Sequence, residues 1–168
     1  MYEPFTSIDE LLNPGVLSRL TGNIVNDVTC SPLPVEHSHS GSGFQTVQID
    51  GDYAGSYILK HVPAAGDWQM RTSGAWVCRE VLAWQTGLIE QLPAEVGHAV
   101  VGCAVHEAGW AILMRDESAG LLYPRESPFS MVEHHRILDS MAALHAKYWG
   151  QHEMADSSLG YCDLRHRI

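Results

Sequence analysis

Hydrophobic and polar residues alternate with a period of two in several short segments, the pattern of strands whose side chains point alternately to the two faces of a sheet. The pattern predicts five strands, at residues 24–33, 44–49, 56–60, 100–105 and 110–114. Turn residues at Gly51-Asp52 and Glu107-Ala108-Gly109 join neighbouring strands as hairpins. We therefore expect a mostly antiparallel sheet.

Hydrophobic residues at three- and four-residue spacing predict helices near both ends of the chain. Ser7 and Glu10 have the spacing of a capping box, so a short helix is expected directly after Ser7. Asn13-Pro14-Gly15 interrupts it, and a second short helix is expected up to Gly22. A longer helix is predicted from Ser130 to about Gly150. Its apolar side consists of Met131, Ile137, Leu138, Met141, Leu144 and Trp149.

A further helix is predicted between the third and fourth strands, capped by Thr72 or Ser73 and ended by Pro93 after about Gln91. One face of it carries Val77, Val81, Trp84 and Leu88. We expect this face to pack on the sheet. The predicted fold is therefore α+β: a five-stranded, mostly antiparallel sheet with one packed helix, plus additional N- and C-terminal helices.

These elements predict five parts of the chain. Residues 1–22 form an N-terminal helical segment, 23–116 the sheet with its helix, 117–129 a connector, 130–150 the long helix and 151–168 a polar tail. The apolar side of the long helix requires something to cover it.

Composition narrows the classes of function. The chain has 168 residues, 45% of them hydrophobic, and a net charge of −10, which disfavours nucleic acids and anionic membrane surfaces as partners. No apolar run approaches membrane-spanning length, and the first residues do not have the pattern of a secretory signal. The four cysteines are far apart, at Cys30, Cys78, Cys103 and Cys162. We expect reduced thiols in a cytoplasmic protein.

One lysine, Lys60, ends the otherwise apolar segment Ser56-Tyr57-Ile58-Leu59-Lys60. The glycine-rich turn Ser40-Gly41-Ser42-Gly43-Phe44 precedes this strand, and the predicted helix after it carries Glu80. Backbone N–H groups at glycines can approach phosphate oxygens closely, and a lysine supplies a point charge that a glutamate can hold in place. This ordered set is typical of the way the kinase fold binds the phosphates of ATP.

Two later segments extend the set: the strand and polar connector from Trp110 to Ser118, and the helix from Ile137 to Ala146 with its Leu-His-Ala sequence. In this order the chain from about Leu33 to Gly150 resembles the amino-terminal lobe of the aminoglycoside phosphotransferase and choline kinase-like superfamily, which has a protein-kinase-like fold and includes small-molecule kinases related to ecdysteroid kinases.

The resemblance implies a nucleotide-binding lobe of an ATP-dependent kinase that acts on hydroxyl-bearing small molecules. It implies that Lys60 contacts the α- and β-phosphates and that Glu80 holds Lys60. The phosphate cover would be Gly41, Ser42, Gly43 and Phe44, and the adenine edge would be Met114, Arg115 and Asp116. ATP is expected as a weak or vestigial ligand, with Mg²⁺ bound only through a second lobe.

The chain also departs from this pattern. Phe44-Gln45 replaces the usual Ser-Asn or glycines after the turn, and Arg115 stands where the family usually has an acidic residue. All asparagines, Asn13, Asn23 and Asn26, precede Lys60, so no His-x-Asp-x-x-x-x-Asn catalytic loop follows it. We therefore name no catalytic residue and expect the 168-residue chain to be a truncated form that is inactive alone.

Two alternatives remain open. Lys60 can be a solvated strand lysine, and the chain can be a non-catalytic α+β interaction module that forms a homodimer through the helix from Ser130 to Gly150. A zinc site at His37-Ser38-His39 or His134-His135 is not expected, because neither pair has a cysteine or carboxylate at ligand spacing. His145 is expected to pack rather than to act as a base.

Overall fold

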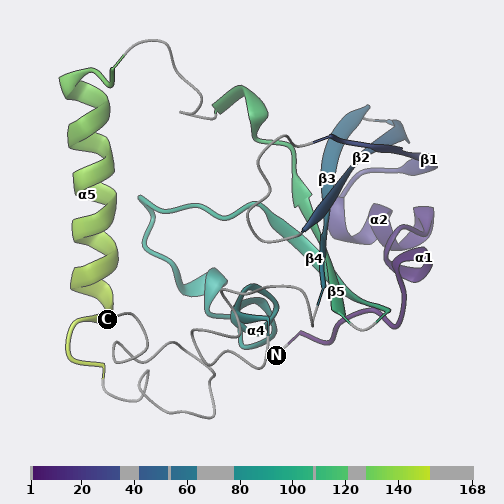
Figure 1. Cartoon of the computed structure of the whole chain (residues 1–168), viewed down its shortest axis with the longest axis horizontal. Coiled ribbons are helices and arrows are strands. Elements are labelled where there is room, and N and C mark those ends of the chain that lie inside the picture. The colour runs from purple at the N-terminus through teal and green to yellow at the C-terminus, as the bar shows by residue number, and fades with distance from the viewer. Residues whose placement is uncertain are drawn as a thin grey trace.

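Five strands form one antiparallel sheet in the computed structural model (Figure 1), which describes residues 2–34, 42–52, 54–63, 78–107, 109–120 and 128–151. The strands are β1 (Val25–Pro32), β2 (Gly43–Gly51), β3 (Gly55–Val62), β4 (Val100–His106) and β5 (Gly109–Arg115). Their spatial order is β1-β2-β3-β5-β4, and every neighbouring pair is antiparallel. The predicted α+β class and its five-stranded sheet are confirmed.

The burial of each strand follows its place in the sheet. Successive residues Ile112 and Leu113 of the inner strand β5 are both buried, because elements cover both faces there. The edge strand β1 is mostly exposed and ends at Pro32, which has no N–H to donate to a second neighbour. The alternation seen in the sequence therefore identifies the strands, and the continuous apolar run identifies the centre of the sheet.

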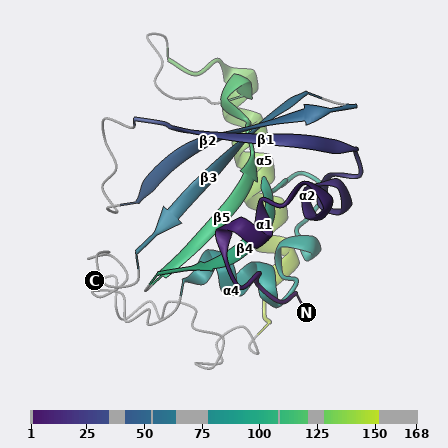
Figure 2. The ribbon, with the colours of Figure 1, turned by 90° about the vertical axis from the view of Figure 1, so that its right-hand side faces the viewer.

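Two short helices, α1 (Ile8–Leu11) and α2 (Pro14–Thr21), cover one face of the sheet (Figure 2). Their fully buried leucines enter a core with residues of all five strands, and this core contains Leu11, Leu17, Val25, Val47, Ile49, Leu59, Ala104 and Leu113. The Ser7 hydroxyl accepts from the Glu10 backbone N–H at 3.1 Å, as the capping box predicts. The Glu10 carboxylate, however, accepts from Thr6 rather than from the Ser7 backbone, so the second half of that prediction is wrong.

The opposite face is covered by α4 (Arg79–Gln85), which buries Val81 and Trp84 against a core with Val62, Cys103 and Ile112. The predicted end near Gln91 is wrong. The helix ends six residues earlier because Gly87 adopts a positive φ of 73°, which terminates a helix, and a separate 3₁₀ turn, η1 (Ile89–Gln91), follows. The predicted caps Thr72 and Ser73 and the residue Val77 lie outside the described residues, and Cys78 is the N-cap of α4.

The long helix α5 (Met131–Tyr148) stands apart from the sheet (Figure 1). It follows η2 (Ser118–Gly120) and begins with a complete capping box between Ser130 and Glu133. The Ser140 hydroxyl donates to the Glu95 carbonyl at 3.2 Å, and the Tyr148 hydroxyl donates to the Gln91 carbonyl at 3.3 Å. The predicted helix is therefore confirmed, and these bonds link it to the segment between α4 and β4. No helix among the described residues is long and apolar enough to cross a membrane.

Candidate functional site

Lys60 and Glu80 form an ion pair between the sheet and α4. The Lys60 Nζ donates to Glu80 Oε1 at 2.7 Å and to Oε2 at 2.9 Å, so both carboxylate oxygens hold one ammonium group. The pairing predicted from the sequence is confirmed. It forms because Lys60 follows the buried Leu59 on β3 and therefore points to the face that α4 covers.

The ion pair lies at the surface rather than in the core. The Lys60 side chain is 19% exposed and that of Glu80 is 54% exposed. Solvent-exposed ion pairs typically contribute only about 0–1 kcal/mol to stability. The position of the charge is the more important consequence, because the Lys60 side chain is mostly covered and both oxygens of the exposed Glu80 carboxylate hold its ammonium group. An ammonium group has three N–H donors, and Glu80 accepts from it twice.

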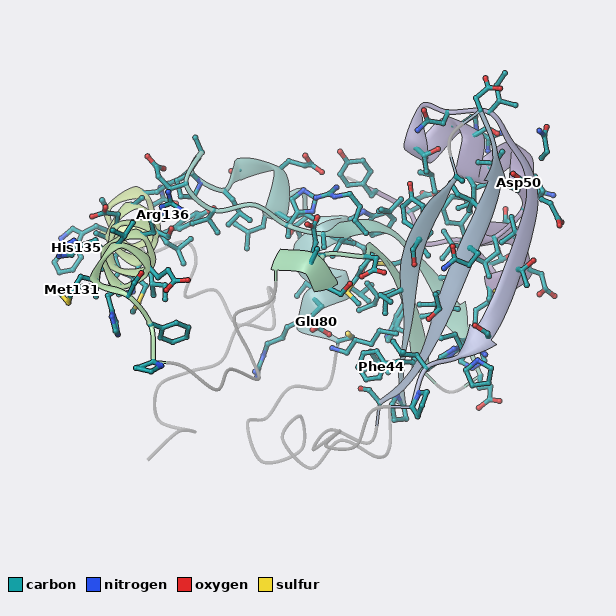
Figure 3. The ribbon with its side chains drawn as sticks, turned by 90° about the horizontal axis from the view of Figure 1, so that it is seen from above. Phe44, Asp50, Glu80, Met131, His135 and Arg136 are labelled. Carbon is teal, nitrogen blue, oxygen red and sulfur yellow. The ribbon has the colours of Figure 1, made fainter. Side chains whose placement is uncertain are left out.

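Phe44 lies directly beside Lys60 on the same face of the sheet. Lys60 pairs with Phe44 of β2 on one side and with Ile112 of β5 on the other, and directly opposed residues share a face. Figure 3 shows Phe44 and Glu80 close together at this face. Gly43 and Phe44 belong to β2 instead of the predicted turn, Ser42 just before them is buried, and Gly41 lies outside the described residues.

The predicted adenine edge lies along the same face at the other end. Met114 pairs with Ile58, two residues before Lys60 on β3, and its side chain packs against the core under α4. Asp116 follows β5 four positions after Ile112, a separation of about 13 Å along a strand. Met114 and Asp116 therefore lie on the other side of β3 from Phe44, beyond Lys60.

Local contacts occupy the two charged residues of this edge. Arg115 donates from Nε to Glu117 Oε1 at 3.2 Å and from a terminal nitrogen to the His98 carbonyl. The Asp116 carboxylate accepts from the Ser118 N–H at 3.0 Å. Hydrogen bonds from Ser118, and a further one from the Ser56 side chain, lower the pKa of Asp116. Both side chains therefore fix the connector, and Met114 is the apolar surface that the edge offers.

Two cysteines lie beside the ion pair, which the spacing of cysteines along the chain did not indicate. The Cys78 Sγ lies 3.9 Å from Glu80 Oε2, and both Cys78 and Cys103 are buried in the core under α4. Burial is the main cause that raises the pKa of Cys78, and it raises the pKa of Cys103 to about 12. Such thiols remain protonated at neutral pH and are poor nucleophiles. For Cys78, the available signal of this contact was its position two residues before Glu80 in the sequence.

The N-terminal segment also supports this site in a way that sequence reasoning missed. The Tyr2 ring stacks on Trp84 with centroids 5.2 Å apart, and the Tyr2 N–H donates to the Gln85 carbonyl at 2.9 Å. Phe5 exchanges backbone hydrogen bonds with β4 through Cys103 and Val105. These contacts attach α4 to the edge of the sheet and so help to hold Glu80 in position.

Other candidate residues do not join the site. Within the described ranges, no three His, Cys, Asp or Glu side chains lie close enough together to hold a metal ion. His37 and His39 lie outside those ranges, while His134, His135 and His145 are exposed on α5. Comparisons of the chain with protein-family models, with curated proteins and with solved structures found no significant match.

Proposed function

We propose that this chain binds the phosphates of ATP at Lys60, in the manner of the amino-terminal lobe of a small-molecule phosphotransferase. The observation that carries the proposal is the ion pair in which both carboxylate oxygens of Glu80 accept hydrogen bonds from the Lys60 ammonium group. This ion pair adds little stability, yet it fixes the Lys60 ammonium group at the solvent-accessible side of the sheet. A fixed cation is preorganised for phosphate oxygens, which lowers the cost of ordering it on binding.

The surroundings of Lys60 support a nucleotide rather than a free anion. Phe44 and Ile112 flank Lys60, and Met114 continues the apolar surface toward the connector. A ligand with phosphates at one end and a flat apolar ring at the other matches this order. Within the proposal, Lys60 binds phosphate oxygens, Glu80 positions Lys60, Phe44 covers the phosphate end and Met114 contacts the adenine.

Weak affinity is part of the proposal. Glu80 offsets much of the Lys60 charge, and salt and water screen charges at an exposed site. The protein also carries a net charge of −10, which opposes the approach of an anion. We therefore expect a Kd for MgATP between high micromolar and millimolar.

Calorimetric titration with MgATP tests the proposal, and the chain supplies a matched control because it has only two lysines, Lys60 and Lys147. We expect Lys60→Ala to weaken binding at least tenfold and Glu80→Gln to weaken it less, since the lysine remains but loses its fixed position. Lys147→Ala removes the same charge from the exposed side of α5 and should bind like the wild type. No heat of binding for the wild type, or equal loss in both lysine variants, would contradict the proposal.

A further inference from the structure

One side of α5 carries hydrophobic residues that the rest of the described chain leaves uncovered. Met131 is 68% exposed, Leu138 is 58% exposed and Met141 is 50% exposed. In Figure 3, Met131 and His135 lie on the side of α5 that faces away from the sheet. The opposite side of the helix carries Ser140, whose hydroxyl bonds to the Glu95 carbonyl. The exposed side is therefore separate from the core along most of the helix and reaches the rest of the fold at Tyr148, whose hydroxyl donates to the Gln91 carbonyl.

Residues at the three- and four-residue spacing of a coiled-coil seam run along this side, and all of them are exposed except the half-buried Tyr148. We call this set the α5 stripe: Met131, His134, Leu138, Met141, His145 and Tyr148. The stripe contains no Asp, Glu, Lys or Arg. The charged residues of the helix lie at other positions, so two such stripes can meet without repulsion even though the whole chain has a net charge of −10.

The order of residues in the α5 stripe is the same in kind from either end. From the N-terminal end, the stripe has a large apolar residue, a histidine and an apolar residue: Met131, His134 and Leu138. From the C-terminal end, it has the same order: Tyr148, His145 and Met141. A two-fold axis between Leu138 and Met141 places Leu138 of one copy against Met141 of the other. It likewise places Met131 against Tyr148, and His134 against His145. A two-fold interface must be self-complementary in this way, whereas a surface for an unrelated partner need not be.

A hollow at the end of α5 fits the same arrangement. It has a volume of about 630 Å³ and is lined by Leu88, Leu92, Leu144, Tyr148 and Trp149, the last being 85% exposed. In the antiparallel arrangement, the Met131 end of the second copy arrives at the Tyr148 end of the first. Phe129 lies at that arriving end and packs edge-on against His134, with centroids 5.6 Å apart. The hollow lies between α5 and the segment after α4, so it offers further apolar surface beside the Tyr148 end of the stripe.

We propose that α5 is a homodimer interface, in which the α5 stripes of two copies pair antiparallel about a two-fold axis between Leu138 and Met141. The helix is about 27 Å long, so the seam alone buries less area than the roughly 800 Å² per partner of a standard interface. The hollow adds to it at both ends. We expect a dimer with micromolar affinity, independent of nucleotide binding.

Sedimentation of the full chain over micromolar concentrations tests the interface. The wild type should approach twice the 18.5 kDa chain mass as its concentration rises. The double variant Leu138→Glu, Met141→Glu places like charges in contact across the axis and should weaken the dimer at least tenfold. Val132→Glu is the matched control, because Val132 is 61% exposed on α5 but lies outside the stripe, and it should leave the dimer intact. Thermal unfolding of each variant checks that it is folded.

A charge reversal tests the antiparallel order. In Leu138→Glu, Met141→Lys, each introduced carboxylate meets an introduced ammonium group of the other copy, so the dimer should recover relative to the double glutamate variant. In a parallel pairing, like charges would meet instead. A variant as monomeric as the double glutamate chain overturns the proposed order. A wild type that remains monomeric overturns the interface, and a monomer that binds neutral phosphatidylcholine vesicles assigns the stripe to a membrane surface.

Discussion

His61 is a histidine whose two ring nitrogens are both buried and find no hydrogen-bond partner within the described part of the chain. It follows Lys60 on β3 and so points to the other face of the sheet, where its ring lies 4.8 Å from that of His106. Burial is the main cause that lowers the pKa of His61, and His106 lowers it further, while Glu107 opposes the shift. Protonation of His61 therefore acts against the fold.

We predict that His61 makes stability depend on pH near neutrality. In the unfolded chain, a histidine has a pKa of about 6.5, and in the folded chain the pKa of His61 is lower. As the pH falls, the unfolded chain therefore takes up a proton at His61 more readily than the folded chain does. The free energy of unfolding should consequently fall as pH is lowered from about 7.5 to about 5.5. His61→Phe keeps an aromatic ring beside His106 but cannot titrate, so its melting temperature should fall less over this range. Identical pH dependence in the two proteins would contradict this assignment.

At the scale of elements, the clearest constraint is the close approach of β2 to the segment before β1. Gly51 pairs with Val25 next to a bulge in β1, where the register shifts between Val25 and Asp27. A Cβ atom at Gly51 would lie 1.9 Å from the Ile24 carbonyl oxygen. Because that obstacle is backbone, it cannot move aside as a side chain could.

We therefore predict that Gly51→Ala destabilises the protein by about 1–3 kcal/mol, the usual cost of forcing extra atoms into a packed site. Denaturant unfolding measures the change. Gly97→Ala is the control, since Gly97 is exposed and a Cβ there would meet nothing within 4 Å. Equal stability of the two variants would show that β1 and β2 separate easily at this end.

The elements differ in how well the sequence predicts them. Strand β5 was predictable because an apolar run ended by a polar connector has few alternatives, and Lys60 could be paired with Glu80 from their order along the chain. The end of α4 was misjudged because Pro93 is a more conspicuous stop signal than Gly87, although Gly87 adopts the positive φ that ends the helix. A continuous apolar run therefore predicted the strand, and the order of segments predicted the ion pair.

Other parts of the site depend on how distant segments meet, which the sequence pattern does not contain. The stack of Tyr2 on Trp84 requires the N-terminal segment to pass between α4 and the edge of β4. The same segment passes Cys103, whose backbone carbonyl accepts from the Phe5 N–H. Sequence reasoning had no period or motif to indicate either contact, and both follow only from the packed fold.

At the scale of the whole molecule, the described residues form two surfaces with different properties. The face with Lys60, Glu80 and Phe44 carries the cation of the proposed site. The α5 stripe contains no Asp, Glu, Lys or Arg, and at Met131 it faces away from the sheet (Figure 3). Because α5 is linked to the rest mainly through the segment between α4 and β4, its pairing need not alter the Lys60 site. The two proposals can therefore fail or hold separately.

The most direct test of phosphate binding at Lys60 is backbone amide chemical-shift mapping of the labelled chain during titration with MgATP, beside adenosine as the ligand without phosphates. We predict that MgATP shifts the amides of Phe44, Lys60 and Glu80, that adenosine shifts Met114 and its neighbours but leaves those three unchanged, and that Lys60→Ala removes the phosphate-dependent shifts. Shifts confined to α1 and α2, or shifts that persist unchanged in Lys60→Ala, would contradict the account.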